Sequence, residues 1–156
     1  MRHHRRNQCG AVGGLEAIVF VALLLIGGSV VATAAWTTLR GQASLDAAAR
    51  EYLRSYSEAP DPLTAAYRGD RAARRSLRDL GIDEHRVRIL RPDLLSFGPC
   101  GLAEVRLELD LPPVPVPFGD AWPSRTISVN RLELIDPHRE MIPGREHNPE
   151  RTPCAT

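Results

Sequence analysis

An apolar run near the N-terminus most constrains what this chain of 156 residues can fold into. The run, GGLEAIVFVALLLIGGSVVATAAW, covers residues 13–36 and contains a single charged residue, Glu16. The segment from Ala17 to Leu39 carries no formal charge, and as a helix it extends about 34 Å. Since the hydrocarbon core of a bilayer is about 30 Å thick, the sequence predicts one transmembrane helix.

The residues before this run set the predicted orientation in the membrane. Arg2, Arg5 and Arg6 lie in a short N-terminal tail, and no second apolar run of comparable length follows. Positive charge beside a span is typical of the cytoplasmic side. We therefore expect a cytoplasmic N-terminus and an extracytoplasmic chain from about Arg40 onward.

A cleaved secretory signal is the alternative, because ATA at residues 32–34 has the pattern of a cleavage site after Ala34. Two features favour an uncleaved anchor. Glu16 interrupts the apolar region, and the chain after Ala34 keeps a helical pattern, with Leu45, Ala49 and Tyr52 on one face. We expect one long helix from about Leu15 to Glu58, with Gly41 as its weak point.

A second helix is predicted between two clear boundary signals. Asp61 is a good N-cap, Pro62 suits the first helical position, and Gly81 suits the position after the end. Its predicted inner stripe is Ala66, Ala73, Leu77 and Leu80. Its arginines (Arg71, Arg74, Arg75 and Arg78) are expected on a solvated face, partly paired with Asp70 and Asp79.

The rest of the extracytoplasmic part is predicted to form strands. Alternating apolar residues indicate strands at 86–90, 103–111 and 126–135, and a phase slip at Asn130–Arg131 suggests a β-bulge. The proline-rich segment 112–123 is expected to connect the last two strands. The predicted fold class is α+β, with a long transmembrane helix leading into one further helix and a three-stranded antiparallel sheet.

The predicted organisation has five parts. They are a cytoplasmic basic tail (1–14), a transmembrane helix (15–39), an amphipathic extension (40–58), a small extracytoplasmic domain (59–136) and an irregular tail (137–156). Cys100 and Cys154 would both lie outside the cytoplasm, where disulfides persist, so we expect them to pair, whereas Cys9 stays cytoplasmic.

Composition and motifs point away from catalysis and nucleic-acid binding. The net charge is +1, so no global field attracts nucleic acid. The chain contains no His-x-x-x-His, Cys-x-x-Cys or glycine-rich phosphate motif. We predict a non-enzymatic protein with no metal, no cofactor and no small-molecule substrate.

The segment CGAVGGLEAIVFVALLLIGGSVVATAAWTTLRGQASLDAAAREYLRSY (9–56) resembles the TadE-like proteins of Tad (Flp-type) pilus systems, especially actinobacterial forms. LELIDPHREMIPG (132–144) is similar to the end of such chains. The resemblance implies a membrane component of pilus assembly or of an envelope secretion apparatus, with other assembly proteins as partners.

The family also implies a role for Glu16, which is pairing with the N-terminal amine of a neighbouring subunit in the membrane. Prepilin-type processing between Gly10 and Ala11 would place Glu16 sixth in the mature chain, where the family pattern has fifth, so an uncleaved anchor stays open. The residue itself also fits a position at the cytoplasmic headgroups. Small residues at Gly27, Gly28 and Ala32 are compatible with packing against a second transmembrane helix, including one from another copy.

Overall fold

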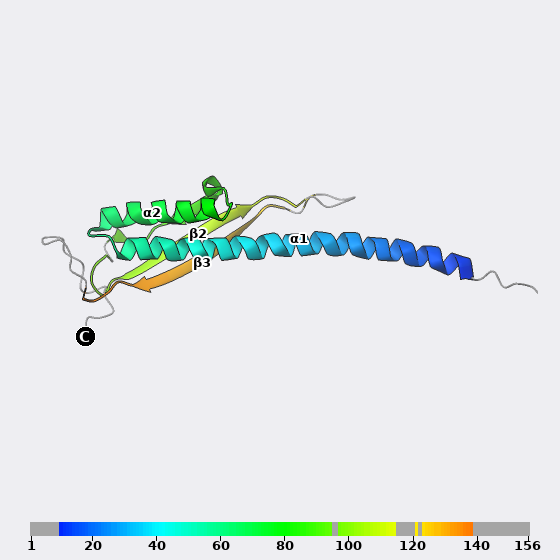
Figure 1. Ribbon diagram of the computed structural model, residues 1–156, viewed down its shortest axis with the longest axis horizontal. Coiled ribbons are helices and arrows are strands. Elements are labelled where there is room, and N and C mark those ends of the chain that lie inside the picture. Colours follow the sequence, from blue (N-terminus) through cyan, green and yellow to red (C-terminus); the bar gives the residue numbers. More distant parts are fainter. Residues whose placement is uncertain (1–9, 95–96, 115–120, 122, 139–156) are drawn as a thin grey trace, which may run out of the picture.

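The computed structural model describes residues 10–94, 97–114, 121 and 123–138, and the side chains from residue 16 onward (Figure 1). Its elements are α1 (Gly10–Ser57), α2 (Pro62–Asp79), a short 3₁₀ helix η1 (Glu84–Arg86), β1 (Val87–Leu90), β2 (Leu102–Leu111) and β3 (Arg125–Leu134). The predicted α+β class is confirmed. Figure 1 shows α1 lying along α2 and the sheet, then projecting far beyond both toward its N-terminal end.

Helix α1 is unbroken for 48 residues, which corresponds to roughly 72 Å. The predicted amphipathic face is confirmed, because Leu45, Ala49, Tyr52 and Tyr56 are fully buried. The helix also continues through Gly41, where a weak point was expected. A Cβ added there would lie 2.7 Å from Cδ1 of Ile127, so the absence of a side chain lets the helix approach the sheet closely at this glycine.

Helix α2 begins and ends as the sequence predicts. The carboxylate of Asp61 accepts hydrogen bonds from the backbone N–H groups of Leu63 (3.1 Å) and Thr64 (3.0 Å). At the other end, Gly81 has a positive φ of 73°. The N–H of Ile82 donates to the carbonyl of Leu77 at 2.9 Å, which completes a Schellman motif.

The predicted inner stripe of α2 is wrong at two of its four positions. The buried residues are Ala65, Gly69, Ala73 and Leu77. Ala66 is half-buried, and Leu80 is exposed at the C-cap. In the stripe that is buried, Gly69 faces the ring of Tyr52 and allows the two helices to approach closely. The contact between α2 and Tyr52 of α1 thus depends on the absence of a side chain at residue 69. A pattern of apolar residues does not identify this position.

The sheet is an antiparallel meander in the order β1-β2-β3. Alternation along β2 is confirmed, because Ala103, Val105, Leu107 and Leu109 face the helices and are buried. Together with the buried face of α1, the inner residues of α2 and Phe97, they form one hydrophobic core.

The predicted β-bulge at Asn130–Arg131 is wrong. Pairing of β2 with β3 runs without interruption from Leu102↔Leu134 to Leu111↔Arg125. The strand keeps its alternation, but its inner face becomes polar near the C-terminal end. Arg131 donates to Asp46 of α1 at 2.5 Å, and Glu133 accepts from the Ser57 hydroxyl at 3.3 Å. Leu132 and Leu134 therefore lie on the outer face and are about half exposed.

The predicted pairing of Asp70 with an arginine of α2 is also wrong. Its carboxylate accepts from the guanidinium of Arg91, with an Nε–Oδ2 distance of 3.1 Å. This pair links α2 to the segment after β1. Arg78 of α2 instead binds Glu84 at 2.7 Å.

We predict that Gly69→Ala lowers the free energy of unfolding by about 1–3 kcal/mol, although alanine is the better helix former. The new Cβ would lie 2.9–3.0 Å from three ring atoms of Tyr52, which is fully buried. Urea unfolding of the detergent-solubilised protein measures the change. In a Tyr52→Leu background the clash is absent, so an equal cost in both backgrounds would contradict this contact.

Two tyrosines form the centre of the core. Tyr52 and Tyr56 stack with ring centroids 5.9 Å apart, and Phe97 meets Tyr56 edge-on at 5.3 Å. Both hydroxyls are buried and have no hydrogen-bond partner among the described residues. Burial, assisted by the charge of Asp93, raises the pKa of Tyr56 to about 12. Burial likewise raises the pKa of Tyr52.

The Tyr56→Phe variant should be more stable than the parent at neutral pH, by about 1 kcal/mol, because it removes a buried hydroxyl without a partner. The raised pKa also means that the folded state holds this proton more tightly than the unfolded chain. The parent therefore loses stability as the pH rises from about 10 toward 12, and this loss should shrink in the variant. Urea unfolding across this pH range tests both effects.

The control is Tyr67→Phe, since Tyr67 is 66% exposed. It should leave both the neutral stability and the alkaline loss unchanged. An unchanged alkaline loss in Tyr56→Phe would show that other groups cause it.

Candidate interaction surfaces

The N-terminal part of α1 is an exposed apolar surface. In the described part of the chain, α1 is the one helix long and apolar enough to cross a membrane, and an 18-residue stretch of it has a mean hydropathy of 2.5. A signal sequence meets the same criterion. Glu16 and Ala32 are exposed, and nothing described lies within 4 Å of a Cβ added at Gly27 or Gly28. Gly28 and Ala32 share a face at i, i+4 spacing, whereas Gly27 lies about 100° away.

Along α1 from residue 16 onward, the first buried residue is Ala34, which is 4% exposed. Burial of α1 thus begins before the predicted end of the transmembrane helix at residue 39. Arg125, the first residue of β3, donates to the Ala34 carbonyl at 3.0 Å and to the hydroxyl of Thr38. One guanidinium thus ties the start of the last strand to the helix where the domain begins.

A groove lies beside this contact, at the end of the domain nearest the exposed part of α1. Its volume is about 430 Å³ and its lining is mostly apolar. It lies where β2 ends and β3 begins, on the side of α1 that carries Thr37. The lining residues are Thr37, Leu111, Pro112, Val114, Pro123 and Arg125.

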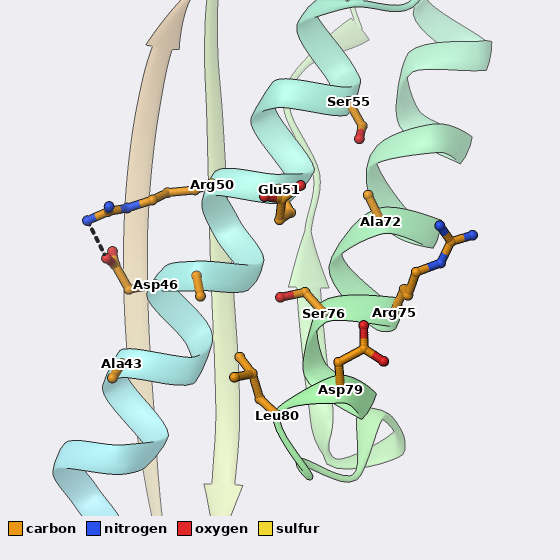
Figure 2. A pocket seen from close by; sticks show the side chains of 11 residues that line it. Ala43, Asp46, Arg50, Glu51, Ser55, Ala72, Arg75, Ser76, Asp79 and Leu80 are labelled. Atoms are coloured by element: carbon orange, nitrogen blue, oxygen red, sulfur yellow. Dashed lines mark ion pairs between the residues drawn. The ribbon is translucent and has the colours of Figure 1, made fainter.

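A second and wider groove, of about 730 Å³, runs between α1 and α2 (Figure 2). Small residues line much of it, among them Ala43, Ala47 and Ala72. Arg50 points away from the groove and forms an ion pair with Asp46, with an Nη2–Oδ2 distance of 2.8 Å. Figure 2 shows Ser76 and Leu80 pointing from α2 toward α1. The charged side chains that line this groove do not converge on one point (Figure 2).

The remaining candidate residues give no further site. Among the described residues, no three His, Cys, Asp or Glu side chains are grouped to hold a metal ion.

Three of the sequence predictions fall wholly or partly outside the described residues, or are not tested by them. Cys9 and Cys154 lie outside the described residues, so the bridge from Cys100 to Cys154 stays a prediction. Gly10 begins α1 and Ala11 follows it, and processing between them is likewise untested. Most of the predicted tail (137–156) also lies outside the described residues.

Comparison of the chain with models of known protein families, with curated proteins and with solved structures finds no match.

The contact between Arg125 and α1 was missed by the sequence analysis. Its only signal is a single arginine between the proline-rich connector and a predicted strand. The partners are Ala34 and Thr38, which are far away in the sequence, so only the folded chain brings them together.

We predict that Arg125→Ala lowers the free energy of unfolding by about 1–2 kcal/mol, at the lower end for a charged hydrogen-bond donor because the side chain is partly solvated. The matched control is Arg88→Ala, which removes an ion pair to Glu108 at 3.5 Å on the outer face of the sheet. The control should be close to neutral. Equal effects of the two changes, measured by urea unfolding in detergent, would contradict a special role for Arg125.

Proposed function

We propose that this protein is a non-enzymatic, single-pass membrane protein, a TadE-like component of pilus assembly or of an envelope secretion apparatus. The observation that supports it best is the continuity of α1. One helix without a break supplies both the exposed apolar segment and the central element of the domain core. Such a helix joins an anchor rigidly to a domain outside the membrane, as a subunit that assembles through its helices requires.

The proposed topology has a cytoplasmic N-terminus and an extracytoplasmic C-terminal domain. The arginines of the N-terminal tail support this orientation. Partners are other pilus-assembly or envelope proteins, or another copy of this chain. They would pack along α1, where Gly28 and Ala32 leave little side-chain bulk on one exposed face.

The local structure at Ala34 supports an anchor that is not cleaved there. Cleavage after Ala34 would separate a buried residue from the domain that buries it. It would also remove the carbonyl that accepts from Arg125. A secreted form beginning at Ala35 would therefore lose part of its own packing.

The intact mass and N-terminal residue of the protein from fractionated cells test the proposal. We expect the membrane fraction to contain a chain that begins at Met1, or at Ala11 if prepilin-type processing occurs. A chain that begins at Ala35 in the soluble fraction would overturn the proposal in favour of a small secreted α/β binding protein.

We further predict that Glu16→Leu reduces assembly with neighbouring subunits several-fold while leaving membrane insertion intact. A carboxylate at the edge of the hydrocarbon core is costly enough to require a partner. Chemical cross-linking of intact membranes followed by mass spectrometry measures assembly. The control is Glu51→Leu, an exposed glutamate in the extracytoplasmic half of α1. No difference between the two variants would place Glu16 at the headgroups instead.

A further inference from the structure

Two large apolar side chains remain exposed on α1 at the level where the domain begins. Trp36 is 68% exposed and Leu39 is 62% exposed. They lie just beyond Ala34, where the domain has already covered the opposite side of the helix. A tryptophan at the end of a membrane span is typical of the interface between headgroups and acyl chains.

The apolar groove at the base of the domain lies at the same depth as these side chains. Thr37, which lines the groove, lies between Trp36 and Leu39 in the sequence. At about 1.5 Å rise per residue, the three differ by less than one turn along the helix axis. A membrane that covers Trp36 and Leu39 must therefore also reach the groove on the other side of the helix.

The chemistry of the groove fits a phospholipid. Leu111, Val114 and two prolines supply an apolar wall, and Arg125 also lines the groove. Arg40 follows Leu39 in the sequence and is exposed, and its guanidinium donates to the carbonyl of Leu80 at 3.4 Å, so a second positive charge lies near this level. Apolar walls suit an acyl chain, and guanidinium groups bind phosphate well.

We infer that the groove lined by Thr37, Leu111, Pro112, Val114, Pro123 and Arg125 binds a glycerophospholipid of the outer leaflet, with an acyl chain along the apolar wall and the phosphate beside Arg125. This inference rests on the proposed membrane anchor. The base of the domain is then a membrane-contact surface, and the domain stands in the interface instead of above it.

Tryptophan quenching by brominated phospholipid tests the inference in the full chain, reconstituted in vesicles of phosphatidylcholine and phosphatidylglycerol. Three variants each carry one reporter. Trp122→Phe leaves only Trp36. The other two carry Trp36→Phe and Trp122→Phe, with Val114→Trp in the groove or Leu134→Trp at the far end of the sheet. Leu134 is 48% exposed, so it is a matched control outside the membrane.

With bromine near the glycerol end of the acyl chain, we expect Trp36 and the Val114→Trp reporter to lose most of their emission and the Leu134→Trp reporter to keep it. Quenching of Trp36 alone would overturn the inference and leave the anchor standing. No quenching of Trp36 would instead overturn the proposed anchor. Equal quenching of all three would also overturn the inference, because the whole domain would then lie on the membrane.

Two further measurements test whether each variant folds and whether lipid or a second copy of the chain occupies the groove. Circular dichroism identifies a variant that fails to fold, and Pro123→Trp then replaces Val114→Trp as the reporter in the groove. Lowering the protein-to-lipid ratio tests competition by a second copy. Quenching that is independent of this ratio supports lipid in the groove, and quenching that appears only on dilution would show that another copy of the chain is the occupant.

Discussion

Burial of one face of α1 is the interaction on which the rest of the structure depends. Leu45, Tyr52 and Tyr56 project from this face and are fully buried, and both α2 and the sheet pack against it. The other elements are short or thin, since α2 has 18 residues and the sheet only three strands. Without α1, the apolar faces of these elements would have no common partner, and a domain of this size has little other core.

Two glycines determine how closely the layers approach α1. Gly41 meets the sheet at Ile127, and Gly69 of α2 meets the ring of Tyr52. A glycine inside a helix costs up to about 1 kcal/mol in propensity, so both are locally unfavourable. At these positions the cost is offset by the contacts that a Cβ would prevent. The buried tyrosines are a second local cost, because their hydroxyls lack partners among the described residues while their rings fill the core.

Much of the fold follows from the sequence because its signals are local. The caps at Asp61 and Gly81 and the alternation along 103–111 each identify one element from neighbouring residues. The failures involve contacts between elements. Apolar spacing alone places Ala66 and Leu80 on the inner stripe of α2, whereas the structure buries Ala65 and Gly69 there, and Gly69 faces the ring of Tyr52. The apolar pattern predicts a bulge because Leu132 and Leu134 are out of phase with Ile127 and Val129, whereas in the structure Arg131 and Glu133 find polar partners on the inner face. The site at Arg125 escaped prediction for the same reason.

Because α1 is unbroken, the domain tilts together with the membrane part of the helix. From Trp36 to Ser57 the helix extends roughly 32 Å, and the contact of Arg125 with Ala34 and Thr38 fixes the domain to it at the near end. In a chain anchored as proposed, a change of about 10° in the tilt of the membrane helix moves the far end of the domain sideways by roughly 5 Å. Neighbouring helices in the bilayer would thereby set the position of Leu132 and Leu134 above the membrane. The packing of helices within the membrane would then also determine the distance between neighbouring domains outside it.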